Sequence, residues 1–234
     1  QMLMTLFVGG NSLIVGVPGL AKTLLIQTVA QVLDLKFSRI QFTPDLMPSD
    51  ILGAEVLETA PDGTRAFRFI EGPIFCPLLM ADEINRAGPR TQSALLQAMQ
   101  EKHVTVAGAR RDLSPPFHVL ATQNPIEQEG TYPLPEAQLD RFLLQIDVTY
   151  PALEAERDIL IATTSADDAD ISPILTGPEL IAAQRLIRQM PVGEGVVDAI
   201  LRLVRAARPG EDEALDFIDR TVNWGPGRRA AQAL

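Results

Sequence analysis

The stretch that most constrains this chain runs from Ile14 to Thr23: an apolar strand, a glycine-bearing loop, and a Lys-Thr pair that opens a helix. Backbone N–H groups of such a loop and of the helix N-terminus converge on phosphate groups. Lys22 would reach the β- and γ-phosphates of a nucleotide, and the Thr23 hydroxyl would contact Mg²⁺. The template G-x-x-x-x-G-K-[ST] has glycine where Ala21 stands, so we expect Ala21 to avoid positive φ. For this loop taken alone, an ordinary strand–turn–helix corner is the alternative.

A second signal is an apolar run, Leu78 to Ala81, that ends in Asp82 and Glu83. Such a run is typical of a buried parallel strand, and in an open α/β sheet ligands bind at the carboxyl edge of the strands. Asp82 would hold Mg²⁺, usually through water, and Glu83 would polarise an attacking water. A strand that ends in a solvated turn is the alternative for this pair taken alone.

Composition restricts the class of protein. The chain has 234 residues, 46% hydrophobic and 21% charged, as in an ordinary globular protein, and its net charge of −10 argues against a surface built for nucleic acid. The basic pair Arg110-Arg111 is too short to reverse that balance. The single cysteine, Cys76, fits a reducing cytoplasm and is interpreted as a buried, inert thiol. His103 and His118 lack the spacing of metal ligands.

The N-terminal segment and the hydropathy bear on targeting. No uninterrupted apolar stretch reaches about 18 residues, so no transmembrane helix is expected. Residues 1–10 are apolar but have neither a basic flank nor a cleavage site, which argues against a signal peptide. We interpret them as the end of a helix that enters from further sequence, so the chain is expected to be truncated.

The middle of the chain alternates strands with helices, which predicts an α/β fold with a mostly parallel, five-stranded sheet in a domain of residues 1–150. Strands are predicted at 12–16, 37–42, 76–82, 116–122 and 143–148, and helices at 22–34, 45–52, 90–101 and 136–141. Turn residues between β-rich segments predict two inserted hairpins, at 55–70 and 104–117.

From Pro151 onward the pattern is helical only, which predicts a small all-helical domain over residues 151–234. An acidic stretch, 167–173, is interpreted as a connector inside it. Helices are predicted at 153–165, 177–190, 193–207, 211–222 and 226–234.

Several separated strings resemble MoxR-type AAA+ ATPases of the helix-2-insert clade, and the resemblance covers nearly the whole chain. The strings are Gly16-Val17-Pro18-Gly19-Leu20-Ala21-Lys22-Thr23, Gln41-Phe42-Thr43-Pro44-Asp45-Leu46, Ala81-Asp82-Glu83-Ile84-Asn85-Arg86-Ala87, Ala121-Thr122-Gln123-Asn124-Pro125 and the most specific one, Glu127 to Phe142. The family itself carries alanine before the P-loop lysine. The resemblance implies a P-loop AAA+ core followed by a helical lid.

The resemblance also implies roles for individual residues. The first string is the Walker A loop, and Asp82 and Glu83 are Walker B. Asn124 matches sensor 1, Arg141 matches an arginine finger that acts on the nucleotide of a neighbouring subunit, and Arg229 matches sensor 2 in the lid. The two hairpins match those that face the pore or axial surface of a ring.

Each role has an alternative in the residues themselves. Asn124 could cap the turn before Pro125. Arg141 could pair with Asp140 or Glu136 at the surface.

The C-terminal motif departs from the family pattern Gly-x-x-Pro-Arg, because Arg228 replaces the proline. This leaves open whether Arg228 or Arg229 reaches the phosphate, with the register favouring Arg229. The family's motif ahead of the first strand is missing, so adenine contacts cannot be placed there.

The resemblance implies binding and hydrolysis of ATP with Mg²⁺, a homo-oligomeric ring that is hexameric, and chaperone-like remodelling of partner proteins. It also implies a partner protein with a von Willebrand factor A domain. Neither binding to nucleic acid nor a membrane span is expected. Two alternatives stay open: a nucleotide-dependent interaction module with little turnover, and a nucleic-acid-associated AAA+ motor.

Overall fold

The computed structural model describes residues 1–59, 61–126, 130–164 and 171–234, with only the backbone described over 162–164. The described residues form two compact units, Gln1–Arg185 and Leu186–Leu234. The predicted boundary between residues 150 and 151 lies inside the first unit and stays a prediction. The predicted connector at 167–173 and the string that starts at Glu127 fall partly outside the described residues.

Over the described residues, five strands form one parallel sheet with the order β2-β5-β8-β1-β9, which confirms the predicted fold class. Each strand matches a predicted one within two residues at either end. The strands are β1 (Ser12–Gly16), β2 (Phe37–Gln41), β5 (Leu78–Asp82), β8 (His118–Gln123) and β9 (Leu144–Val148).

Both faces of the sheet are buried at its central strands, β1, β5 and β8, where residues that point to opposite faces are both buried. In β5, Leu79 and Ala81 enter one apolar core and Leu78 and Met80 enter the other. This double burial explains why β5 reads as a continuous apolar run, whereas the edge strands β2 and β9 include exposed polar residues. Cys76 lies in the first core, as expected, and burial raises the pKa of its thiol to about 12.

Helices of the first unit follow the strands, and most agree with the predictions. They are α1 (Met2–Val8), α2 (Lys22–Val32), α3 (Pro48–Leu52), η1 (Ile84–Arg86), α4 (Pro89–Glu101), α5 (Glu136–Leu139), α6 (Leu153–Thr164) and α7 (Gly177–Gln189), whose last turn belongs to the second unit. The start predicted for α3, residue 45, was three residues early. Pro48 occupies the first helical position and the Asp50 carboxylate accepts the Met47 N–H, so the helix begins there.

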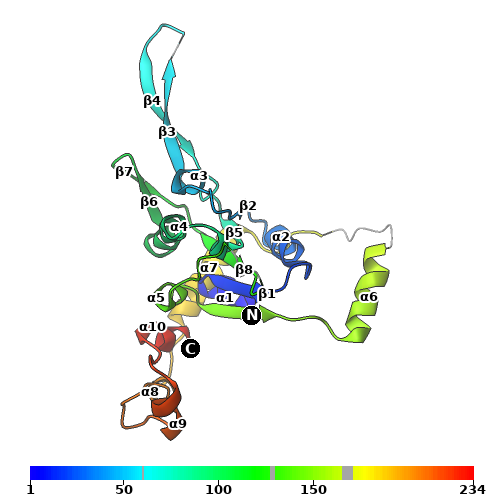
Figure 1. Cartoon of the computed structure of the whole chain (residues 1–234), viewed down its shortest axis with the longest axis vertical. Helices are drawn as coiled ribbons and strands as arrows, with labels where there is room; N and C mark the ends of the chain where they lie inside the picture. Colours follow the sequence, from blue (N-terminus) through cyan, green and yellow to red (C-terminus); the bar gives the residue numbers. More distant parts are fainter. Residues whose placement is uncertain (60, 127–129, 165–170) are drawn as a thin grey trace. The chain divides into compact units, whose positions relative to one another are not determined.

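Both predicted hairpins are present (Figure 1). One pairs β3 (Gly53–Thr59) with β4 (Arg65–Glu71), and the other pairs β6 (His103–Val106) with β7 (Ala109–Asp112). The second turns through Ala107 and Gly108, both at positive φ, as a two-residue hairpin loop requires. Strands β3 and β6 contact each other, so the hairpins are neighbours.

The described residues of the second unit are helical, with α10 packed beside α8. The helices are α8 (Glu194–Ala206), α9 (Asp216–Thr221) and α10 (Arg228–Ala233). The helix predicted at 211–222 is shorter than expected: Leu215 is extended and its N–H donates to the Ala206 carbonyl oxygen at the end of α8, so α9 begins only at Asp216. Within the ranges that the structure describes, no helix has the length and apolar character needed to cross a membrane.

Candidate functional site

The loop between β1 and α2 is shaped by close packing at one end and by left-handed backbone at the other. A Cβ on Gly16 would lie 2.7 Å from the Val148 carbonyl oxygen of the neighbouring strand, so only glycine fits at the end of β1. Gly19 adopts φ +84°. The expectation that Ala21 avoids positive φ was wrong: Ala21 has φ 52° and is the residue that precedes the first turn of α2. Such a backbone costs roughly 1–2 kcal/mol for a residue with a Cβ, and strain of this kind gathers at functional sites.

Lys22 directs its amine back into this loop. Its Nζ donates hydrogen bonds to the carbonyl oxygens of Gly16 and Val17. Partial burial lowers the pKa of Lys22, and the nearby carboxylates of Asp82 and Glu83 oppose that shift. The amine is therefore a cation positioned between the loop and the acidic pair.

Asp82 is the last residue of β5, and both of its carboxylate oxygens accept hydrogen bonds. Oδ1 accepts the Thr122 hydroxyl at 2.5 Å. Oδ2 accepts the Arg39 guanidinium, from Nη2 at 2.6 Å and from Nε at 3.2 Å. Asp82 is only 9% exposed, so these partners replace most of the water that would otherwise solvate its charge.

Glu83 follows with φ 56°, a left-handed conformation that is uncommon for a residue with a long side chain. Its N–H donates to the Thr122 hydroxyl at 2.9 Å, so one threonine holds both acidic residues. Its Oε2 accepts from Gln41 Nε2 at 2.8 Å and from Arg86 Nη1 at 3.0 Å. These two donors fix the orientation of the Glu83 carboxylate.

Asn124 lies just beyond the end of β8 and is 4% exposed. Its Oδ1 accepts the Ile126 N–H at 3.1 Å, which confirms that it caps the turn around Pro125. The same residue also lines the cavity described next, so the turn and the cavity share this side chain.

One hollow of about 270 Å³ brings most of the predicted site residues together. It lies where β1, β5 and β8 end, at the carboxyl edge of the parallel sheet, which is where this class of fold binds ligands. Its lining residues are Pro18, Gly19, Leu20, Ala21, Lys22, Thr23, Asp82, Glu83, Thr122 and Asn124.

The two predicted arginines are not among the residues that line this hollow. Arg141 follows α5, and its Nε is buried with no hydrogen-bond partner in the described part of the chain. Arg228 and Arg229 open α10 after Gly227, two residues after the predicted start at 226. The roles of these arginines stay predictions.

Sequence reasoning missed Arg39 and Thr122 as site residues and gave no role to Gln41 or Arg86. Arg39 and Gln41 are two residues apart in β2 and so point to the same face, and the pairing of Gln41 with Asp82 puts both side chains beside the acidic pair. That pairing depends on the strand order, which a single sequence does not contain.

A metal would find hard oxygen donors here, the Thr23 hydroxyl and the Asp82 carboxylate, which suit Mg²⁺. Among the residues the structure describes, no group of three or more His, Cys, Asp or Glu side chains could hold a metal by itself. The protein would therefore supply part of a coordination shell, as is usual for Mg²⁺ that also binds phosphate and water.

Comparison with known proteins agrees with this geometry. Residues 11–144 match the model of the ATPase family associated with various cellular activities (AAA). Chaperone MoxR1 of Mycobacterium tuberculosis is 44% identical over all 234 residues, and the protein YeaC of Bacillus subtilis is 41% identical over 88% of the chain. The chain spans 61% and 64% of the lengths of these two relatives.

A crystal structure of a candidate ATPase from Cytophaga hutchinsonii superposes with a TM-score of 0.88 at 40% identity, over 99% of this chain and 70% of that one. The family model covers more than half of this chain, from β1 into β9. The chain therefore belongs to the AAA ATPases, in their MoxR branch.

Proposed function

We propose that this protein binds ATP with Mg²⁺ and hydrolyses it in order to remodel or activate partner proteins. The observation that carries the proposal is the gathering of Lys22, Thr23, Asp82, Glu83 and Asn124 around one hollow at the carboxyl edge of the sheet. A phosphate-binding loop, two acidic residues and a polar amide are the parts that phosphoryl transfer to water needs.

The side chains divide this work by their chemistry. Backbone N–H groups of the loop and the Lys22 amine would bind the phosphates, and the amine would exchange its two carbonyl partners for phosphate oxygens. Thr23 and Asp82 would hold Mg²⁺, which neutralises charge on the phosphate oxygens. Glu83, oriented by Gln41 and Arg86, would polarise the attacking water, and Asn124 would orient that water or contact the γ-phosphate.

Arg141 would complete the site of a neighbouring subunit. The support is its place in Leu139-Asp140-Arg141-Phe142, which matches the arginine-finger motif of the family that the chain resembles. An arginine supplied in trans is worth roughly 10³ to 10⁵ in rate. Catalysis would then require a homo-oligomer, for which we propose the hexameric ring implied by the family, with Arg229 of the lid as the sensor 2 residue.

The partner is proposed from the relatives. The name of the M. tuberculosis relative describes a chaperone, and we extend a chaperone-like role to this chain. A partner with a von Willebrand factor A domain, and a place in the cytoplasm, are part of the same proposal. Arg110 and Arg111 pair with Asp112 and Glu55, so this basic pair is locally compensated, which agrees with a protein partner better than with nucleic acid.

The test is steady-state ATP hydrolysis with Mg²⁺, measured as activity per subunit against protein concentration. We expect activity per subunit to rise with concentration, to collapse in Arg141→Ala, and to fall at least about 100-fold in Glu83→Gln, which should still bind ATP. Arg68→Ala, a change at an exposed arginine of β4, is the matched control. ATP binding with a flat rate near zero would instead favour the interaction module, and stimulation of hydrolysis by DNA would favour the nucleic-acid motor.

A further inference from the structure

Arg39 stands out among the charged residues around the site, because it contacts one acidic residue directly and the other through a single side chain. It lies on β2, with its side chain 45% exposed, and donates two hydrogen bonds to Asp82 Oδ2. The same Nη2 donates to Gln41 Oε1 at 2.9 Å. Neither the sequence pattern nor the proposed mechanism gives it a role.

The bond to Gln41 determines which way that amide points. Since Arg39 has donors only, the oxygen of the Gln41 amide must face it, and the amide nitrogen must face the other way. That nitrogen donates to Glu83 Oε2 at 2.8 Å. The Glu83 carboxylate, which only accepts, demands the same orientation, so Arg39 restrains the amide in the orientation that holds Glu83.

The bond to Asp82 has an electrostatic consequence for a metal. A divalent cation held by the Asp82 carboxylate, directly or through water, would share that carboxylate with the guanidinium. Two cations beside one carboxylate repel each other, so Arg39 weakens the affinity for the metal while it keeps the carboxylate in place.

We infer that Arg39 is a positioning residue that sets the Mg²⁺ requirement of the site and, through Gln41, the orientation of Glu83. The inference rests on the proposed function. A guanidinium suits both tasks, because its planar fork can bond two acceptors at once, whereas an ammonium is a compact point charge. A merely structural ion pair would contribute to folding and leave both properties unchanged.

The experiment compares Arg39→Met and Arg39→Lys with the native chain, using Lys36→Met as the matched control. Lys36 is an exposed cation just before the same strand. The first readout is binding of a fluorescent, non-hydrolysable ATP analogue as Mg²⁺ is titrated. The second is kcat and KM for ATP at saturating Mg²⁺.

For Arg39→Met we expect half-saturating Mg²⁺ to fall by roughly three- to tenfold, because a nearby positive charge is removed. We expect kcat to fall about tenfold or more with KM for ATP nearly unchanged, because Glu83 loses its orientation. Arg39→Lys should keep the native Mg²⁺ requirement and still lose kcat. Lys36→Met should match the native chain in both readouts.

An unchanged or higher Mg²⁺ requirement in Arg39→Met would overturn the inference, as would full kcat in Arg39→Lys. If Arg39→Met does not fold, the kcat of Arg39→Lys still decides the positioning role. A native chain that binds and hydrolyses ATP while both Arg39 variants behave like Lys36→Met would refute this inference alone. A native chain that does not bind the analogue would refute the proposed function and this inference with it.

Discussion

The carboxyl edge of the central sheet and the β3–β4 hairpin hold their charged side chains in opposite ways. At the sheet edge, Asp82 is almost buried and its two oxygens accept three hydrogen bonds, from Thr122 and Arg39. On the hairpin, Arg68 and Glu58 form one ion pair with both side chains more than half exposed. The partners of Asp82 replace water that its carboxylate loses on burial. Arg68 and Glu58 keep most of their water, so their pairing adds little to what solvation already provides.

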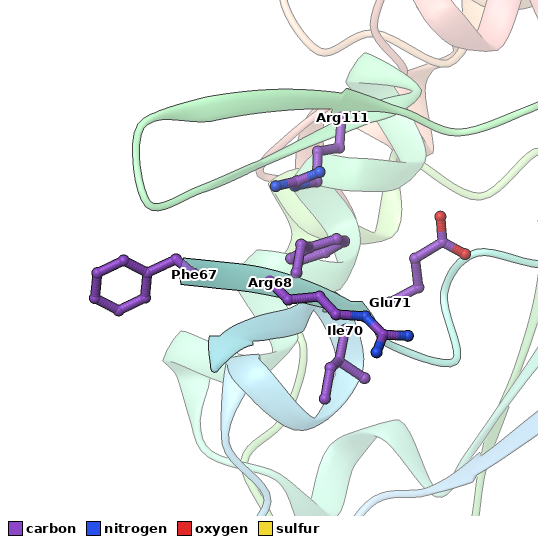
Figure 2. A pocket seen from close by; sticks show the side chains of 6 residues that line it. Phe67, Arg68, Ile70, Glu71 and Arg111 are labelled. Atoms are coloured by element: carbon purple, nitrogen blue, oxygen red, sulfur yellow. The ribbon is translucent and has the colours of Figure 1, made fainter. Parts of the chain in front are cut away.

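The β3–β4 hairpin also borders a hollow, and several of the side chains that line this hollow are exposed to solvent. Figure 2 shows Arg111 reaching from the second hairpin toward β4, while Phe67 points away from the strand. The Arg111 guanidinium lies 3.7 Å from the centre of the Phe69 ring, and Phe67 is 73% exposed. The lining residues are Phe67, Arg68, Phe69, Ile70, Glu71 and Arg111. The comparison teaches that a polar group is worth more to the fold where water cannot replace its partner.

Thr122→Val is the strongest test of that comparison. The change keeps the shape but removes the hydroxyl that donates to Asp82 and accepts from the Glu83 N–H. Two buried polar groups lose a partner, so we expect the free energy of unfolding to fall by about 2–4 kcal/mol, measured by urea denaturation. Thr105→Val, at an exposed position of β6, is the control and should stay within about 0.5 kcal/mol. Equal effects at the two threonines would break the comparison.

His118 extends the test to the interior of the sheet. Its Nδ1 pairs with the Gly10 carbonyl at 2.8 Å and its Nε2 with the Gln184 amide nitrogen at 3.0 Å, which fits a neutral ring. Burial lowers the pKa of His118 in the folded protein, so the unfolded chain takes up a proton first as pH falls. His118 should therefore stabilise the fold fully above its unfolded pKa of about 6.5 and lose that contribution progressively below it.

The measurement is thermal unfolding between about pH 7.5 and pH 5.5, a range that spans the unfolded pKa. We expect a flatter pH dependence in His118→Gln than in the native chain. The chain has two histidines, and His103→Gln serves as the control because His103 lies outside the central sheet, at the start of β6. A slope that His103→Gln removes and His118→Gln leaves intact would contradict the assignment.

Arg111→Met should have a smaller effect. The change removes the stack on Phe69 and a 3.5 Å contact with Glu55, but it also removes a buried Nε that has no hydrogen-bond partner in the described residues. We expect a loss of about 0.5–1 kcal/mol in the free energy of unfolding. A loss as large as that of Thr122→Val would show that the charged contacts of the hairpin contribute as much to the free energy of unfolding as those at the sheet edge.

Arg68→Gln should have the smallest effect. It breaks an ion pair in which both partners stay solvated, so we expect a change within about 0.5 kcal/mol in the free energy of unfolding. Raising the salt concentration should erase even that difference. A change above 1 kcal/mol, or one that persists in high salt, would mean that exposure is a poor guide to the worth of this pair.

Much of the fold followed from local patterns. The apolar runs of β1, β5 and β8 are bounded by turn residues, so their positions could be predicted to within two residues. Both hairpins could be predicted from turn residues between β-rich segments. The short α9 could not, because Leu215 is extended and its N–H donates to the Ala206 carbonyl oxygen at the end of α8, a contact that the local pattern does not contain.

The candidate site divides in the same way. The loop with Lys22 and Thr23 and the acidic pair Asp82-Glu83 are contiguous in sequence, so their residue types and spacing were enough to predict them. The positive φ of Ala21 was predicted wrongly, because the loop accepts local strain that a propensity argument treats as prohibitive. Arg39 had no signal of its own, since its partner lies 43 residues away.

The sequence by itself determined the elements, the phosphate-binding loop and the acidic strand end, because these depend on neighbouring residues and on the period of burial along a strand. Only the tertiary structure decided which side chains surround the two carboxylates. The order β2-β5-β8-β1-β9 brings Arg39 and Gln41 to one side of the acidic pair and Thr122 to the other. Strand order is chosen by packing the whole sheet between its two cores, and no local pattern encodes it.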